Sequence, residues 1–382
     1  MSQPYVKRIE WARLEGQRPR HAGKNARLEA HGVIVRPPIA RVTLSDGSSG
    51  FGISYAGREA SPREAMQPVL GQPLESVFSG QPGPPGPLDY PLWDLAARRA
   101  GKPVYALAAE AAGVTPPAAP PRVPCYDTSL YFDDLHLDSH EAAAELMAQE
   151  ARQGYERGHR AFKIKVGRGA RHLPLEAGTQ RDIAVIRAVR QAVGPQPRLM
   201  VDANNGYNLN LAKRVLEETA ECRLFWIEEA FHEDPVLYRD LKEWLASRGI
   251  STLIADGEGT AAPALLDWAR NGIVDVVQYD YASYGFSRWL LTGRRLDEWG
   301  ARTAPHHYGG HYGNYASGHL AGAIRGFTFV EWDEATTPGL DGSAYTVQEG
   351  HVTLPELPGF GVRLEESAFR RAVQDTGFTL EA

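Results

Sequence analysis

Short runs of β-branched and aromatic residues recur through the central part of the chain, and most of them end in charged or polar side chains. Such runs are typical of strands that are buried on both faces. We expect eight strands, at residues 123–128, 161–166, 199–204, 224–229, 252–258, 273–280, 301–307 and 326–331. Apolar residues three and four positions apart predict helices between them, for example at 139–153, 180–193 and 211–222.

The order of these elements predicts an α/β fold, because strands that alternate with helices form a parallel sheet. An open, doubly wound sheet would gather a functional site at one switch point. Here Lys163, Asp202, Glu228 and Glu258 lie at or near the ends of four successive strands. Polar residues at successive strand ends favour a closed barrel with its site on the C-terminal face.

Residues 1–120 have a different pattern, in which strands are followed by helices. Residues 36–53 read as a β-hairpin with an Asp46-Gly47 turn, and residues 87–109 as an amphipathic helix closed by Gly101. This pattern predicts a small α+β domain. The proline-rich stretch 114–124 is the expected linker to a barrel over 121–350, and residues 351–382 are expected to return to the first domain.

Composition narrows the class of protein. The chain has 382 residues, 43% hydrophobic and 23% charged, with a net charge of −6. This balance indicates a globular protein and gives no basic surface for nucleic acid. No apolar run reaches the roughly 18 residues that span a membrane, and the first residues lack a signal-peptide core. Only Cys125 and Cys222 occur, which indicates neither a disulfide framework nor a zinc site. We expect a cytoplasmic protein.

Strand alternation predicts which side chains share the barrel mouth. Lys163 and Lys165 point to the same side, as do Asp202 and Asn204. By the same rule Glu229 should face away from Glu228, and Asp256 away from Glu258, if each strand stays regular.

The acids at the ends of three successive strands, Asp202, Glu228 and Glu258, are the candidate metal ligands. Unpaired, three clustered carboxylates would repel one another strongly. Oxygen-only ligands fit Mg²⁺, which keeps further positions for water or substrate oxygens. The alternative is that the acids form salt bridges with Lys163 and Lys165.

A histidine pair, His306 and His307, ends the seventh strand, and Asp280 ends the strand before it. An aspartate on a neighbouring strand can fix the tautomer of an imidazole and make it a general acid or base. His311 and His319, in the glycine-rich stretch that follows, are competitors for this role.

A basic stretch at residues 15–31 has two interpretations. It contains Arg18, Arg20, His21, Lys24 and Arg27. It is either a solvated loop or a lid that closes on an anionic ligand, because guanidinium groups pair with carboxylates in a bidentate manner.

Taken together, these motifs resemble the enolase superfamily, mandelate racemase subgroup. The motifs that carry the resemblance are Lys163-Ile164-Lys165, Asp202-Ala203-Asn204, Trp226-Ile227-Glu228-Glu229, Gly257-Glu258, the pair Asp280 and His306, and Glu331 on the last strand. The segments LSDGSSGFG and PLWDLAARRAGKPVYALA are similar to the capping domain of that family. The chain departs from the family pattern at Ala230, where proline is common, and at residues 281–285, where a Gly-Gly pair is common.

The resemblance implies a modified TIM barrel, (β/α)7β, with an α+β capping domain. It implies that Asp202, Glu228 and Glu258 bind Mg²⁺ and that Lys165 is a base. Lys163 would neutralise the substrate carboxylate and ease deprotonation of Lys165, and Glu331 would hydrogen-bond an enediolate oxygen. His306, which alignment to the family's Pro-His step favours over His307, would act on the opposite face, oriented by Asp280. Asn204 would contact the substrate or support the metal.

These residues would remove the proton from the carbon next to a carboxylate. The acid or base on the opposite face, His306, would then decide which product forms. We expect an acid sugar dehydratase, because the basic stretch and the polar residues near His306 suit a hydroxylated substrate, which could carry one or two carboxylates. Arg18, Arg20, His21, Lys24 and His307 are the expected substrate contacts besides Asn204. The main alternative is a racemase or epimerase, followed by a non-catalytic barrel or a magnesium-dependent aldolase or isomerase. We expect a homo-oligomer whose partner is a small carboxylate.

Overall fold

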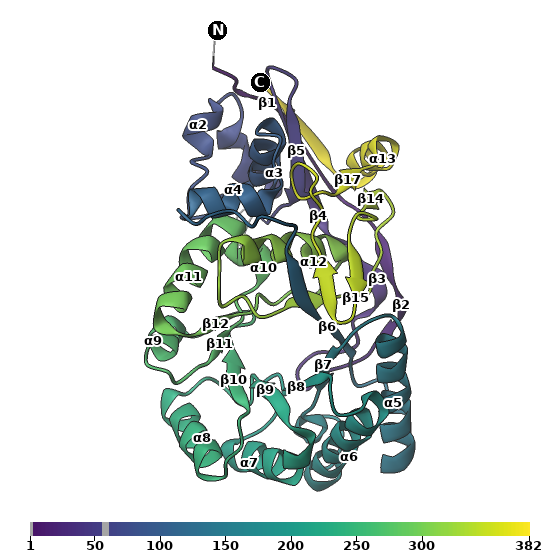
Figure 1. Cartoon of the computed structure of the whole chain (residues 1–382). Helices are drawn as coiled ribbons and strands as arrows, with labels where there is room; N and C mark the ends of the chain where they lie inside the picture. Colours follow the sequence, from purple (N-terminus) through teal and green to yellow (C-terminus); the bar gives the residue numbers. More distant parts are fainter. Residues whose placement is uncertain (1–2, 56–60) are drawn as a thin grey trace.

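The computed structural model describes residues 3–55 and 61–382 and has two parts, a barrel and a second domain packed beside it (Figure 1). The barrel confirms the predicted fold class. Its eight strands are β6 (Arg122–Leu130), β7 (Ala161–Lys165), β8 (Arg198–Asp202), β9 (Leu224–Glu228), β10 (Leu253–Asp256), β11 (Val276–Val277), β12 (Arg302–Thr303) and β13 (Val330–Trp332). All neighbouring pairs are parallel, β13 pairs with β6, and a bridge from Thr303 to Phe327 closes the ring.

Helices on the outside connect the strands, as the 3.6-residue periodicity predicts. They are α5 (His140–Glu156), α6 (Leu175–Val193), α7 (Leu209–Glu218), α8 (Pro235–Ser247), α9 (Leu265–Arg270), α11 (Phe286–Trp299) and α12 (His311–Gly318). Ser139, Asn208 and Asp234 cap three of them by accepting hydrogen bonds from backbone N–H groups of the first turn.

The sixth and seventh strands are shorter than expected. The predicted runs 273–280 and 301–307 form strands of only two residues each. Beyond them the backbones leave the regular ladder and meet again at a single bridge between Asp280 and His306. The bridge places Asp280 and His306 on adjacent segments at the barrel mouth.

The inside of the barrel is filled by one apolar layer with a residue from each strand or its end. Its members are Tyr126, Ala161, Met200, Trp226, Ala255, Val276, Ala304 and Phe329. Large and small residues alternate around much of this ring, so that the indole of Trp226 fills space left by alanines. The layer makes the barrel a packed core that supports whatever lies above it.

The capping domain is an antiparallel sheet with helices, in the order β18 (Phe378–Glu381), β1 (Val6–Arg13), β4 (Pro38–Leu44) and β5 (Ser49–Ile53). The last strand comes from the C-terminal segment and pairs antiparallel with β1. The predicted helix 87–109 is two helices, α3 (Asp89–Arg99) and α4 (Val104–Ala111), because Gly101 adopts φ +64° between them. Just beyond residue 350, β16 (His351–Thr353) still pairs with β6.

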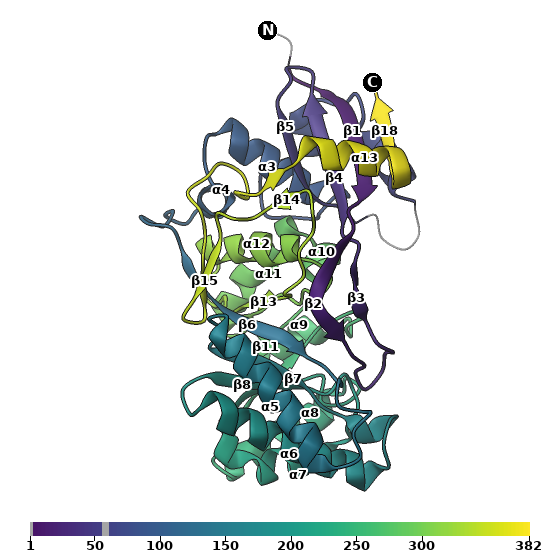
Figure 2. The same ribbon diagram turned by 90° about the vertical axis from the view of Figure 1, so that its right-hand side faces the viewer.

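The stretch 15–31 is not a loop throughout. It contains β2 (Gly16–Ala22), which pairs with β3 (Gly32–Val35) to form an arm that extends from the capping domain along the barrel (Figure 2). Backbone bonds fasten the arm at two barrel loops: Gln17 and Thr336 exchange bonds of 2.8 and 2.9 Å, and Phe132 N–H donates to Lys24 O at 2.9 Å. The arm is therefore docked on the barrel.

We expect the Met200→Ala variant to lose about 2–5 kcal/mol of unfolding free energy, because it opens a cavity in a fully buried layer that cannot collapse. Urea denaturation followed by circular dichroism measures this. Val236→Ala, at a side chain 68% exposed on α8, is the matched control and should change the free energy by less than about 0.5 kcal/mol. Equal effects of both variants would contradict the packed layer.

Candidate active site

A polar layer lies directly above the apolar one, two residues further along most strands. Its buried members are Thr128, Lys163, Asp202, Glu228, Gln278 and Glu331, with His306 at the rim. Alternation along the strands produces this layer, since each of these side chains has the same orientation as the apolar residue that precedes it. Charged groups are thus held at the C-terminal face with an apolar floor below them.

Three carboxylates converge in this layer. Oxygen atoms of Asp202, Glu228 and Glu258 lie within 4.8 Å of one another. Glu258 Oε2 is buried and has no hydrogen-bond partner among the described residues. An unsatisfied buried carboxylate oxygen is costly, so the group has the donor set and the open valence that suit a hard divalent cation.

Both lysines pair with this group. Lys163 Nζ lies 2.8 Å from Glu228 Oε1, 2.9 Å from Glu331 Oε1 and 3.5 Å from Asp202 Oδ2. Lys165 Nζ donates to Asp202 Oδ2. The salt bridges considered as an alternative are therefore present, and they coexist with a Glu258 oxygen that accepts no hydrogen bond from the described residues.

The ion pairs set the pKa values of the layer. Burial raises the pKa of Glu228 to about 8. Burial alone would also raise the pKa of Asp202, but Lys165 and Lys163 outweigh it and lower that pKa. Burial and the charge of Lys163 act to lower the pKa of Lys165, as expected from the sequence, yet Asp202 and Glu258 outweigh them, so it is raised. Lys163 therefore acts on the pKa of Lys165 in the expected direction, but the neighbouring carboxylates have the larger effect.

His306 has the geometry of an oriented acid or base. Its Nδ1 lies 2.6 Å from Asp280 Oδ1, and its Nε2 lies 3.6 Å from Glu258 Oε2. Burial would lower the pKa of His306, but Glu258, Glu331 and Asp280 raise it to about 10. The Asp280 bond leaves Nε2 directed at the carboxylate group, which is the arrangement a proton-transfer residue needs.

The other histidines are engaged elsewhere. His307 Nε2 bonds to Gly310 O, while its backbone N–H donates to Glu331 Oε2 at 2.8 Å. His311 faces Leu340 O, and His319 accepts from Tyr105 N–H and bonds to Tyr345 Oη. The geometry therefore favours His306 over its three competitors.

Glu229 does not face away from the site, so that expectation is wrong. Strand β9 ends at Glu228, and Glu229 adopts φ +43°, which breaks the alternation on which the expectation depended. Its carboxylate accepts from Asn204 Nδ2 at 2.8 Å and Asn205 Nδ2 at 3.0 Å. Asp256 does point outward, where Tyr238 Oη donates to it.

The basic residues of the arm meet protein carboxylates. Arg18 is buried and donates to Asp333 Oδ1 at 3.1 Å and Oδ2 at 2.9 Å. Arg20 pairs with Glu150, and Lys24 with Glu29. His21 is exposed, with Nδ1 3.8 Å from Asp133. The contacts of Arg18 and Arg20 fasten the arm to the barrel. Substrate contact by the four residues stays a prediction.

A cavity of about 330 Å³ opens beside the carboxylate group. Asn204, Glu229 and Glu258 line it from the barrel, and Asn25 and Arg27 line it from the arm. Asn204 itself bonds through its backbone N–H to Asp202 Oδ1 at 2.9 Å, while its side-chain oxygen is buried without a partner among the described residues. This position suits a residue that touches a ligand or supports an ion.

Several residues at the mouth were not predicted. Thr128 donates to Glu331 at 2.6 Å and Gln278 Nε2 to Glu228 at 2.9 Å. Strand alternation could have found Gln278, which lies two residues before Asp280. His31 and Tyr308 also meet near Lys165, but they come from distant segments and carry no sequence signal.

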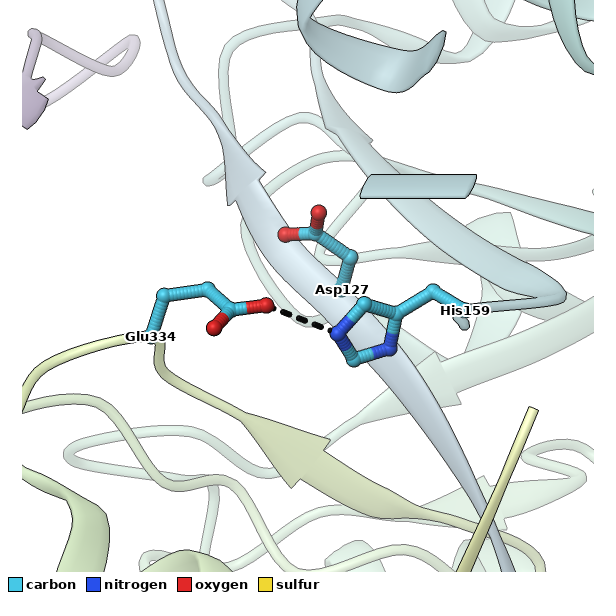
Figure 3. A group of neighbouring side chains, drawn as sticks. All are labelled: Asp127, His159 and Glu334. Carbon is cyan, nitrogen blue, oxygen red and sulfur yellow. Dashed lines mark hydrogen bonds and ion pairs between the residues drawn. The ribbon is translucent and has the colours of Figure 1, made fainter. Parts of the chain in front are cut away.

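A second group, Asp127, His159 and Glu334, lies on the outer side of β6 (Figure 3). His159 Nε2 lies 2.8 Å from Glu334 Oε1, and the guanidinium of Arg157 bonds to both carboxylates, at 3.2 and 3.0 Å. Because Arg157 already neutralises these acids, the group is an ion-pair network that ties the segment after β13 to β6 and α5.

Comparisons with known proteins agree with this geometry. Residues 146–368 match the family model described as Enolase C-terminal domain-like, more than half of the chain. The chain belongs to the enolase superfamily. None of the helices in the described part of this superfamily member is long and apolar enough to cross a bilayer.

The chain is similar to solved acid sugar dehydratases. A galacturonate dehydratase from Geobacillus sp., solved with D-galacturonate and 5-keto-4-deoxy-D-galacturonate, is 46% identical, covers 99% of both chains and has a TM-score of 0.91. A mutant of that dehydratase is solved with Mg. L-Talarate/galactarate dehydratase of Salmonella typhimurium is 26% identical over 357 residues, 87% of this chain and 81% of the relative. These similarities confirm the predicted family, the hydro-lyase class and the use of Mg²⁺.

Protonation of His159 should make stability depend on pH. Burial would lower its pKa, but Cys125, Glu334 and Asp127 raise it to about 10. A pKa raised above the unfolded value of roughly 6.5 gives stability that is complete below that value and is lost as pH rises toward 10. Urea unfolding of the wild type should therefore weaken more between pH 6.5 and 10 than that of His159→Gln, with His136→Gln, at an exposed histidine, as control. Parallel curves for wild type and His159→Gln would contradict a protonated His159.

Proposed function

We propose that the chain is a Mg²⁺-dependent dehydratase of a hexuronate of the D-galacturonate type. The observation that carries the proposal is the placement of Lys165 and the His306–Asp280 pair around one carboxylate group. The substrate class is supported by the 46% identical enzyme solved with D-galacturonate and its 5-keto-4-deoxy derivative. In such a product the proton leaves C5, next to the carboxylate, and the hydroxyl leaves C4.

Asp202, Glu228 and Glu258 would hold the Mg²⁺ ion, with Asn204 supporting them. When bound, the ion supplies positive charge that lowers the energy of electrons moving onto the substrate carboxylate. Lys163, buried beside Glu228 and Glu331, adds a fixed cation at the same place. These charges are preorganised in a site with little water, where they act more strongly than in solution.

Lys165 would take the proton from C5. To take a proton, the Lys165 amine must be neutral. The carboxylate of Asp202 stabilises the charged ammonium form of Lys165, and this stabilisation would weaken if Asp202 bound a metal ion instead. Lys163 then disfavours the ammonium form of its neighbour, which is the direction already seen in its effect on Lys165. Glu331, held by Thr128 and the His307 N–H, would accept a hydrogen bond from the protonated substrate oxygen.

His306 would donate a proton to the departing C4 hydroxyl. The electrons of the C5–H bond first move onto the carboxylate and give an enediolate. They then form the C4–C5 double bond as the C4–O bond breaks, water leaves, and the resulting enol becomes the ketone. Strand β12 is separated from β7 by β13 and β6, so His306 acts from across the mouth. Return of the proton to C5 instead would give an epimer, which is the alternative.

We further propose that the enzyme works in the cytoplasm as a homo-oligomer, since enzymes of this size commonly form symmetric assemblies. Light scattering coupled to size exclusion would test the second statement. A monomer at micromolar concentration would exclude it.

Removing one carboxylate should weaken Mg²⁺ binding. We expect Glu258→Gln to raise the dissociation constant at least about tenfold, because even supporting groups of a metal site contribute that much. Isothermal titration with MgCl2 alone measures it. Glu243→Gln, at an exposed glutamate of α8, should bind as wild type. Unchanged affinity in Glu258→Gln would remove the assignment of this ligand.

Loss of either proton-transfer residue should abolish most turnover. With D-galacturonate and Mg²⁺, we expect Lys165→Ala and His306→Asn to lower kcat by about 10²- to 10⁴-fold, the usual contribution of a general acid or base. Keto-acid formation is the readout, with deuterium exchange at C5 followed by NMR. Exchange without keto acid in the wild type would point to the epimerase, and turnover in Lys165→Ala equal to wild type would exclude the mechanism.

A further inference from the structure

We propose that His31, Tyr131 and Tyr308 form the subsite for the uncharged, hydroxylated part of the sugar acid, and that this subsite selects monocarboxylates over dicarboxylates. The inference rests on the proposed function and specifies its substrate class. It concerns the mouth of the barrel beside Lys165.

The three rings form one cluster contributed by three segments. His31 meets Tyr131 and Tyr308 edge-on, with ring centroids 5.0 and 5.2 Å apart, and the two tyrosines are stacked at 5.0 Å. Lys165 Nζ lies 5.3 Å from the centroid of Tyr131. The cluster therefore lies close to the nitrogen that, under the proposed function, takes the proton.

Two polar atoms of this cluster have nothing to bond. His31 Nε2 and Tyr308 Oη are buried, and neither has a hydrogen-bond partner among the described residues. Buried imidazole and phenol groups ordinarily find partners, because an unpaired polar atom costs free energy. The two atoms belong to rings that contact each other, and the hydroxyl groups of a ligand would satisfy both.

The cluster of His31, Tyr131 and Tyr308 is uncharged. Burial, Lys165 and Arg18 lower the pKa of His31 to about 4, so its imidazole is uncharged near pH 7 and can donate or accept one hydrogen bond. Arg18 lies over the ring of Tyr308 at 4.0 Å, and its Nε and Nη2 atoms donate to Asp333. The two cations that act most on His31, Lys165 and Arg18, are each paired with a carboxylate. A second carboxylate buried here would therefore lack a free cationic partner, which is costly.

The position of His31 is fixed by the arm. The bidentate Arg18–Asp333 pair and the backbone bonds of Gln17 to Thr336 attach β2 to the segment after β13. Next to Asp333, Glu334 is tied to His159 and Arg157 on the outer side of the barrel. The neutral ring is thus presented from a docked element, which makes it a rigid contact for hydroxyl groups.

The first test measures binding without turnover. In the Lys165→Ala background with Mg²⁺, calorimetry compares D-galacturonate with the dicarboxylate galactarate. We expect galacturonate to bind more tightly, and the added changes His31→Ala and Tyr308→Phe each to weaken its binding about three- to tenfold, the effect of one neutral hydrogen bond. Val33→Ala, at an exposed side chain of the same arm, is the control and should change nothing. Equal or tighter binding of galactarate, or no loss in His31→Ala and Tyr308→Phe, would overturn the subsite.

The second test separates this inference from the proposed function. In the otherwise wild-type enzyme, His31→Ala should raise the KM for galacturonate more than it lowers kcat, while the affinity for Mg²⁺ stays constant. Binding without any keto-acid formation by the wild type would remove the proposed reaction and leave the subsite in place. Turnover of galacturonate that His31→Ala and Tyr308→Phe leave unchanged would remove the subsite and leave the reaction in place.

Discussion

The constraint on which the site depends is the crowding of like charges at the C-terminal ends of parallel strands. Asp202, Glu228 and Glu258 cannot remain together as free anions in a buried layer. Lys163 and Lys165 offset part of this charge, and a divalent cation offsets it further. The same crowding prepares the chemistry, since every group that balances the carboxylates also favours negative charge on a substrate.

The layers of the barrel support this crowded group of charges. A ring of apolar residues fills the interior below the charged layer and excludes water from beneath it. Above, the capping domain contributes the arm of β2 and β3, which closes one side of the mouth (Figure 2). Charge pairs on that side, Arg18 with Asp333 and His159 with Glu334, connect the arm and the outer helices to the end of β13.

The strand ends and the surrounding loops contribute different groups to the site. The strand ends carry the groups to which we assign the proton transfers, and the register of the sheet fixes their positions. The segments that face them, including the arm and the loops after β6 and β12, carry His31, Tyr131 and Tyr308. In TIM-barrel enzymes the loops at this face are the part that differs between chemistries and substrates, while the strand scaffold is kept.

The sequence by itself determined the barrel and most of the polar layer. Periods of 2 and 3.6 residues and the regular spacing of charged strand ends are local signals, so Lys163, Asp202 and Glu228 could be placed from them. Where a strand stops being regular the alternation failed, as Glu229 shows with its φ of +43°. Only the tertiary structure decided that Arg18 is bound by Asp333, that His306 and not His307 faces the carboxylates, and that His31 meets two tyrosines. These contacts join segments far apart in the chain, and no periodicity within one segment records them.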